Sequence, residues 1–210
     1  MLPKFVKFRI IVIPAALAWL AAVLAGFVTL HAYEATPGPA GRSPEGWPAS
    51  SRLAPSRGRA DVLMALHPRC PCTIASLESL AEIVRESSGA ATVRLLAYRP
   101  DGSPEGWGAA GIRRAAETVP GAIVVDDPGG VEARRFGLGT SGAIVAFDAS
   151  GRTRFSGGPT SGRGVAERSA GGASLGEVLA NRGPARADCQ TYGCPLVSGP
   201  RGSCSRSDRP

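Results

Sequence analysis

The distribution of apolar and polar residues divides the chain into an uncharged N-terminal stretch, a segment without periodicity, an alternating region and a tail. Residues 10–30 read IIVIPAALAWLAAVLAGFVTL and contain no charged side chain. At about 1.5 Å per residue, a helix of this length crosses a hydrocarbon core of about 30 Å. We therefore predict a transmembrane helix over residues 10–30, preceded by a short N-terminus over residues 1–9.

Basic residues flank the apolar stretch on its N-terminal side, where Lys4, Lys7 and Arg9 precede it. The positive-inside rule leaves such a basic end in the cytoplasm. A cleavable signal peptide is the alternative, but its apolar region is usually about 7–15 residues long and ends at a small-x-small site. The longer run and the exit sequence LHAYEA favour an uncleaved anchor. We expect a single-pass membrane protein whose domain lies outside the cytoplasm, on the periplasmic side of a bacterial membrane.

The stretch that follows is dominated by Pro, Gly, Ser and Arg and shows no apolar periodicity. Such a composition does not bury enough apolar surface to offset the entropy lost on ordering. We predict a flexible linker over residues 31–58.

Strand and helix patterns alternate over residues 59–182. Short apolar runs bounded by turn residues predict strands, and apolar residues at helical spacing predict helices. The strands are expected at 62–66, 92–98, 122–125, 143–148 and 152–157, the last two forming a hairpin, and the helices at 72–88, 108–118, 131–136 and 174–181. This order predicts an α/β sandwich with a mixed sheet, followed by a cysteine-containing tail over residues 183–210.

The charge and composition exclude some functions. The net charge is +7, but the basic residues are scattered and are not interleaved with aromatic residues, so we expect no nucleic-acid partner. The glycine-rich segment 156–164 lacks the G-K-[ST] sequence of a phosphate-binding loop. We expect no dissociable cofactor.

The candidate chemistry lies in HPRCPCT, where the first predicted strand runs into the first predicted helix. Cys70 and Cys72 stand at this helix start, and free N–H groups together with the helix dipole stabilise a thiolate there. Arg69 adds a positive charge beside Cys70, and Pro71 restricts the turn between the two sulfurs. This arrangement predicts thiol redox chemistry, with Cys70 as an exposed attacking thiol and Cys72 as the resolving or helix-buried one.

Alternatives for the cysteines remain open at this stage. His67, Cys70 and Cys72 together offer three ligands for copper or zinc, and the cysteine pair could also form a structural bridge. A disulfide between Cys70 and Cys72 would close a very small, strained ring. The partner of one of them could therefore lie elsewhere, and Cys194 is the best distant candidate. Cys189 and Cys194 could also form a local bridge, which would leave Cys204 unpaired.

Three segments together resemble the RedB-type thioredoxin-like proteins, which are membrane-anchored bacterial proteins. The segments are HPRCPCT, RFGLGTSGAIVAFDASGRTRFSGGPT and TYGCPL, and the resemblance covers about residues 59–198. It implies a thioredoxin-like three-layer sandwich. The sequence departs from ordinary thioredoxins because Cys72 stands for the second active-site cysteine and Arg69 for the first. Ser141 or Gly142 replaces the cis-proline of the family.

These observations predict a membrane-anchored extracytoplasmic thiol–disulfide oxidoreductase that acts on the thiols or disulfides of other proteins. The alternatives are a copper-handling domain, a thioredoxin-like peroxidase with its cysteine before Thr73, and an inactive thioredoxin-like adaptor.

Overall fold

The computed structural model describes residues 4–87, 91–104, 107, 109–167, 169–182 and 187–196. The chain forms two units, one ending at Thr36 and one beginning at Pro37. The first unit is a single helix, α1 (Lys4–Glu34). Within its segment Val12–Glu34, an 18-residue window has a mean hydropathy of 2.1, and none of that window is buried. Among the described residues, this helix is long and apolar enough to cross a membrane, as the sequence predicts by length and composition.

The second unit is built on a mixed sheet of six strands in the order β3-β2-β1-β4-β5-β6. Strands β1, β2 and β3 are parallel, β4 is antiparallel to β1 and β5, and β6 is parallel to β5. The elements are β1 (Ala60–Leu66), α2 (Cys72–Glu86), β2 (Ala91–Arg99), α3 (Ala109–Ala116), β3 (Ile123–Pro128), α4 (Val131–Arg135), β4 (Ile144–Phe147), β5 (Thr153–Gly157), α5 (Ala170–Leu179) and β6 (Ala187–Asp188).

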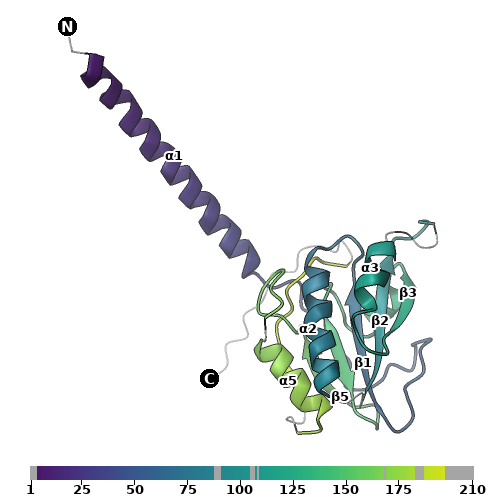
Figure 1. Ribbon diagram of the computed structural model, residues 1–210. Helices are drawn as coiled ribbons and strands as arrows, with labels where there is room; N and C mark the ends of the chain where they lie inside the picture. The colour runs from purple at the N-terminus through teal and green to yellow at the C-terminus, as the bar shows by residue number, and fades with distance from the viewer. Residues whose placement is uncertain are drawn as a thin grey trace. The chain divides into compact units, whose positions relative to one another are not determined.

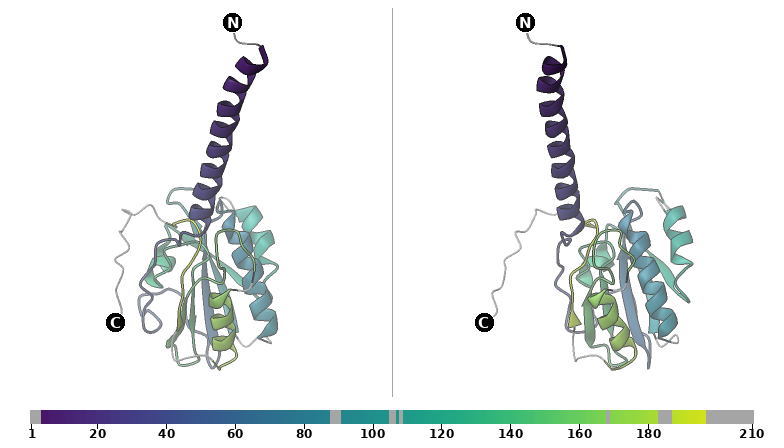
Figure 2. Two further views of the ribbon diagram at one scale, coloured as in Figure 1. Left: turned by 90° about the vertical axis from the view of Figure 1, so that its left-hand side faces the viewer. Right: turned by 60° about the vertical axis from the view of Figure 1, so that its left-hand side comes forward.

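Both faces of the sheet are covered. Helices α2, α3 and α5 pack on one face through the larger core cluster (Figure 1). Helix α4 and the segment before β1 cover the other face through a second cluster, and the sheet is seen edge-on between these layers in Figure 2. This arrangement confirms the predicted thioredoxin-like three-layer α/β sandwich. It also explains why β1 is apolar throughout after Asp61, because a strand buried on both faces has no side for exposed polar residues.

Residues 37–58 pack on the domain, which corrects the predicted flexible linker over 31–58. Trp47 and Leu53 belong to the second core cluster. The backbone amide of Trp47 donates to the carbonyl of Gly151 at 2.9 Å, and Gly46 forms a β-bridge with Arg152. We call residues 37–58 the N-terminal strap. Its order comes from a few anchoring side chains and close backbone approaches, which leave no periodic pattern in the sequence.

Two buried carboxylates hold the end of the strap. Glu132 is fully buried and accepts a hydrogen bond of 2.5 Å from the Ser51 hydroxyl. Asp61, at the start of β1, accepts hydrogen bonds from the amide of Ser56 at 2.7 Å and from its hydroxyl at 2.9 Å. Asp61 also pairs with Arg94. Because a buried carboxylate is stable only when it is paired or hydrogen-bonded, these contacts fix where the strap can lie.

The described part of the tail is also packed, which corrects its separation from the domain at residue 183. Strand β6 extends the sheet beside β5. Thr140 forms a β-bridge with Pro195, and Leu196 is buried in the second core cluster. The domain therefore includes residues 187–196. Cys204 lies outside the described residues.

Candidate functional site

The loop between β1 and α2 brings Cys70 and Cys72 to the start of α2, as the sequence predicts. The amide of Cys70 donates to the carbonyl of His67 at 3.0 Å, and the amide of Thr73 donates to the carbonyl of Cys70 at 3.1 Å. Pro71 precedes the helix with φ −63° and ψ −28°. Proline is well suited to this position because the first N–H groups of a helix have no backbone acceptor.

The sulfur of Cys70 receives four hydrogen bonds. Burial raises the pKa of Cys70, but hydrogen bonds from the thiol and the amide of Cys194, the hydroxyl of Thr73 and the amide of Cys72 lower it. The hydrogen bonds prevail, so the pKa of Cys70 lies below that of an ordinary cysteine. Hydrogen bonds to the charged form favour that form, and the thiolate is the reactive species.

Two expectations about Cys70 need correction. Its side chain is only 5% exposed and that of Cys72 only 8%, so Cys70 is not the exposed thiol that the sequence predicts. The predicted role of Arg69 also changes, because its guanidinium lies 4.5 Å above the ring centre of Trp107. Hydrogen bonds, rather than Arg69, lower the pKa of Cys70.

The two neighbouring thiols have the opposite shift. Burial and the charge of Cys70 raise the pKa of Cys72. Burial, together with its hydrogen bond to Cys70, raises the pKa of Cys194 to about 12. The site therefore combines one thiol that ionises readily with two that keep their protons. All four cysteines among the described residues, including the half-buried Cys189, carry free thiols in this structure.

Thr73 and Ser141 orient the hydrogen bond to Cys70. Both residues are buried, and their hydroxyls lie 2.8 Å apart. The Ser141 hydroxyl accepts from the amide of His67 at 2.9 Å. Its own proton can then be donated to Thr73, whose hydroxyl proton has both the Cys70 sulfur and, at 3.3 Å, the carbonyl of His67 as acceptors. Ser141 thus takes part in the site, and it is one of the two residues, with Gly142, expected from the resemblance at the place of the cis-proline of thioredoxins.

His67 points into an aromatic cluster. Its ring stacks on Tyr98 with ring centres 5.4 Å apart, and it meets the edge of Trp107 at 6.3 Å. Its Nδ1 accepts from the amide of Arg69 at 3.2 Å. Burial and Arg69 lower its pKa. No group of three His, Cys, Asp or Glu side chains in the described part of the chain is placed to hold a metal ion.

Sequence reasoning missed Arg163. Its guanidinium donates to the carbonyl of Gly193, and its charge lowers the pKa of both Cys72 and Cys194. A single arginine in the glycine-rich segment 156–164 carries no sequence signal for this role, since only the fold brings that segment beside the thiols.

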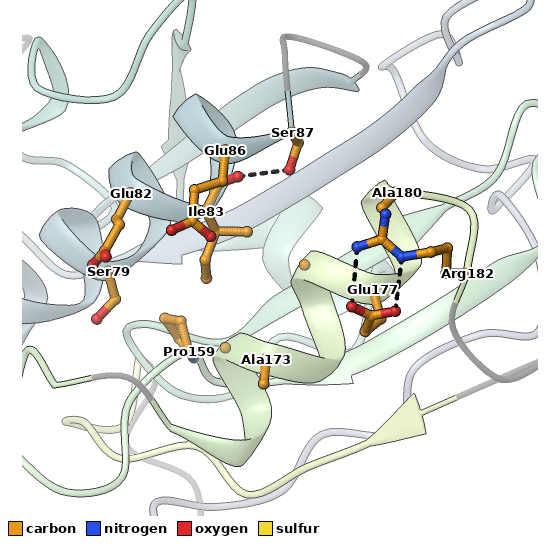
Figure 3. A pocket seen from close by; sticks show the side chains of 12 residues that line it. Ser79, Glu82, Ile83, Glu86, Ser87, Pro159, Ala173, Glu177, Ala180 and Arg182 are labelled. Carbon is orange, nitrogen blue, oxygen red and sulfur yellow. Dashed lines mark hydrogen bonds and ion pairs between the residues drawn. The ribbon is translucent and has the colours of Figure 1, made fainter.

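A groove of about 270 Å³ lies between α2 and α5 (Figure 3). Glu177 and Arg182 form an ion pair of 3.2 Å at its edge. No cysteine lines this groove, so we assign it no part in the thiol chemistry.

The lowered pKa of Cys70 predicts a distinctive pH dependence. Alkylation of Cys70 by iodoacetamide should level off below the pH of about 8.5 at which an ordinary thiol is half ionised. Replacing Thr73 with Val removes one donor to the thiolate and should move the profile up by about one pH unit. Peptide mass spectrometry of pH-quenched samples measures this shift. An unchanged profile in the variant would contradict the assigned hydrogen bond.

The same shift affects folding stability. Because the pKa of Cys70 is lower in the folded protein than in the unfolded chain, ionisation stabilises the reduced fold. This contribution is complete above the unfolded pKa of about 8.5 and is lost as the pH falls through the lowered value.

Comparison with protein-family models and with curated proteins finds no match. Among solved structures, the chain is similar to a hypothetical protein from Sinorhizobium meliloti, with 16% identity, 78% of this chain and 96% of that chain covered, and a TM-score of 0.55. It is also similar to an uncharacterized conserved protein from Geobacillus kaustophilus, with 15% identity, 80% and 97% covered, and a TM-score of 0.55.

A further similar structure is a secreted Mycobacterium tuberculosis disulfide oxidoreductase homologous to E. coli DsbE. Identity is 18%, coverage is 60% of this chain and 83% of that chain, and the TM-score is 0.43. At such identities, similarity is limited to the fold, and the function has to be argued from the site itself.

Proposed function

We propose that this protein is a thiol–disulfide oxidoreductase in which Cys70 is the attacking thiol. The observation that carries the proposal is the set of four donors around the Cys70 sulfur, two of which are backbone amides. Such a site stabilises the thiolate both as nucleophile and as leaving group. A buried structural cysteine requires no such donors.

A cleft gives access to Cys70 from the side of α3. Its volume is about 280 Å³, and its lining includes Cys70, Pro68, Ile74 and Ile112. Ile74 is 55% exposed, although it follows the reactive loop directly. An exposed apolar side chain beside a nucleophile suits an extended segment of another protein around its own cysteine. Protein thiols and disulfides are therefore the proposed substrates.

The exchange proceeds through a mixed disulfide. The Cys70 thiolate attacks one sulfur of a substrate disulfide, forms a bond to it and releases the other sulfur as a thiolate. A second thiol of the protein then attacks Cys70, and the substrate leaves fully reduced. Cys72 and Cys194 both contact Cys70 and are the candidates for this step. Two protein thiols supply both electrons, so the reaction needs no dissociable cofactor.

The proposed location is the outer side of the membrane. Lys4, Lys7 and Arg9 precede the apolar helix, which favours a cytoplasmic N-terminus and an extracytoplasmic domain. Thiol–disulfide exchange on protein substrates suits that oxidising side.

Detergent-solubilised, reduced full-length protein tests this function against a small aromatic disulfide at pH 7. We expect the folded protein to react about tenfold or more faster than the same chain unfolded in urea, because unfolding removes the donors that lower the pKa of Cys70. Equal rates in the two states would refute the proposal.

A further inference from the structure

We propose that Cys194 is the resolving cysteine, so that the oxidised protein carries a Cys70–Cys194 disulfide rather than one within the C-x-C pair. This inference rests on the proposed function and specifies its second step. Cys194 reaches the sulfur of Cys70 with both its thiol and its backbone amide. The two residues come from segments more than a hundred positions apart, which the fold brings together.

The segment that carries Cys194 is held firmly in place. The amide of Ser141 donates to the carbonyl of Cys194 at 2.8 Å, and the amide of Leu196 donates to the carbonyl of Gly139 at 3.0 Å. At Gly193, a Cβ atom would lie 2.0 Å from the carbonyl oxygen of Ser141, so only glycine permits this approach. The backbone on both sides of Cys194 therefore keeps its thiol beside Cys70.

Cys72 is less suited to the same bond. Its thiol also contacts Cys70, but Pro71 between them has helical φ and ψ angles. A bond between residues two apart would close a very small ring, whereas a disulfide needs Cβ atoms about 3.5–4.5 Å apart. A Cys70–Cys194 bond joins two separate segments and imposes no such ring.

The resolving step balances as follows. In the mixed disulfide, Cys70 is bonded to one substrate sulfur. Cys194 loses its proton and attacks Cys70, which forms the Cys70–Cys194 bond and breaks the bond to the substrate. The substrate sulfur leaves as a thiolate and takes up a proton. The two protein thiols are thereby oxidised and the substrate disulfide is reduced, and the reverse sequence oxidises a substrate dithiol.

The electrostatics of the site set the order of the two steps. Burial and the interaction with Cys70 raise the pKa of Cys194 to about 12, so Cys194 is protonated while Cys70 is a thiolate. Once Cys70 is part of a mixed disulfide, its negative charge is gone and no longer raises the pKa of Cys194. Arg163 still lowers the pKa of Cys194. Cys194 thus becomes a better nucleophile only after Cys70 has reacted.

Stopped-flow release of the aromatic thiolate tests the inference. The experiment uses full-length protein in detergent, with Cys189 and Cys204 replaced by Ser to remove their background reaction. The starting protein should release two equivalents, the second from the resolving step. The variant Cys194→Ser retains a hydroxyl donor to Cys70, so its first release should stay within about twofold, whereas its second should slow by about 100-fold or more.

The variant Cys72→Ser is the comparison. Its second release should slow far less than that of Cys194→Ser, and peptide mapping should find Cys70 linked to Cys194. A second release that is unaffected by Cys194→Ser but lost in Cys72→Ser would overturn the inference and leave the proposed function intact. Absence of a fast first release in the starting protein would instead refute the proposed function.

Discussion

In protein with Cys204 replaced by Ser, the variant Cys70→Ser should lose nearly all exchange with a small disulfide, with the rate at pH 7 falling by a factor on the order of 100 or more. Serine fits the site and can accept the same hydrogen bonds, but its hydroxyl does not form a disulfide. The remaining thiols of Cys72, Cys189 and Cys194 have raised pKa values and are protonated at this pH. They therefore supply little thiolate.

Cys189→Ser is the control for this experiment. Cys189 is half-buried near the end of β5, where its atoms lie against Gly157, and burial raises its pKa. Its replacement should leave the exchange rate within about twofold of the unmodified protein. If Cys70→Ser retained the normal rate while Cys189→Ser reduced it, the reactive thiol would have been assigned to the wrong residue.

The sequence predicts the parts of the fold that depend on local pattern. Strand β1 is recognisable because a central strand covered on both faces has an almost continuous apolar sequence. The amphipathic pattern of α2 then places Cys70 and Cys72 at a strand-to-helix junction. Both inferences need only residues that are close together along the chain, and the structure agrees with them to within two residues at the helix end.

The strap and the tail follow contacts that a sequence pattern does not encode. Gly41 illustrates this, because a Cβ atom there would lie 1.5 Å from the carbonyl oxygen of Gly137. In the sequence, Gly41 is one glycine among several in a segment that reads as a flexible linker. Gly193 likewise permits a close backbone approach, between the tail and Ser141. The sequence makes Cys194 a candidate partner of Cys70, but its position beside Cys70 depends on these tertiary approaches.

Arg69 shows why adjacent charge is a weak predictor. It precedes Cys70 directly, and sequence reasoning assigns it the role of lowering the thiol pKa. Its long side chain instead stacks on Trp107. Arg163 is almost a hundred residues away in the chain and is the cation that acts on Cys72 and Cys194. The direction of each side chain, which depends on the fold, decides which of the two arginines acts on the thiols.

The strap should contribute strongly to stability, and Trp47→Ala should lower the free energy of unfolding by about 3 kcal/mol. The Trp47 ring lies 5.0 Å from that of Phe136 and 5.1 Å from that of Phe147. Its Nε1 donates to the carbonyl of Leu53 at 2.9 Å. Truncation would open a void over the second core cluster and remove the side chain that fixes the middle of the strap. Urea unfolding of the detergent-solubilised protein, followed by circular dichroism, measures the loss.

Trp107→Ala is an unusually close control, because both tryptophans follow the same four residues, Ser-Pro-Glu-Gly. Trp107 contacts Arg69 and the edge of His67 and belongs to neither core cluster. Its loss should cost about 1 kcal/mol or less, mainly the cation–π contact. Equal losses of unfolding free energy in the two variants would mean that packing of the strap on the second core cluster does not stabilise the fold. A larger loss for Trp47 would show that the tertiary contacts, and not the shared local sequence, determine what each tryptophan does.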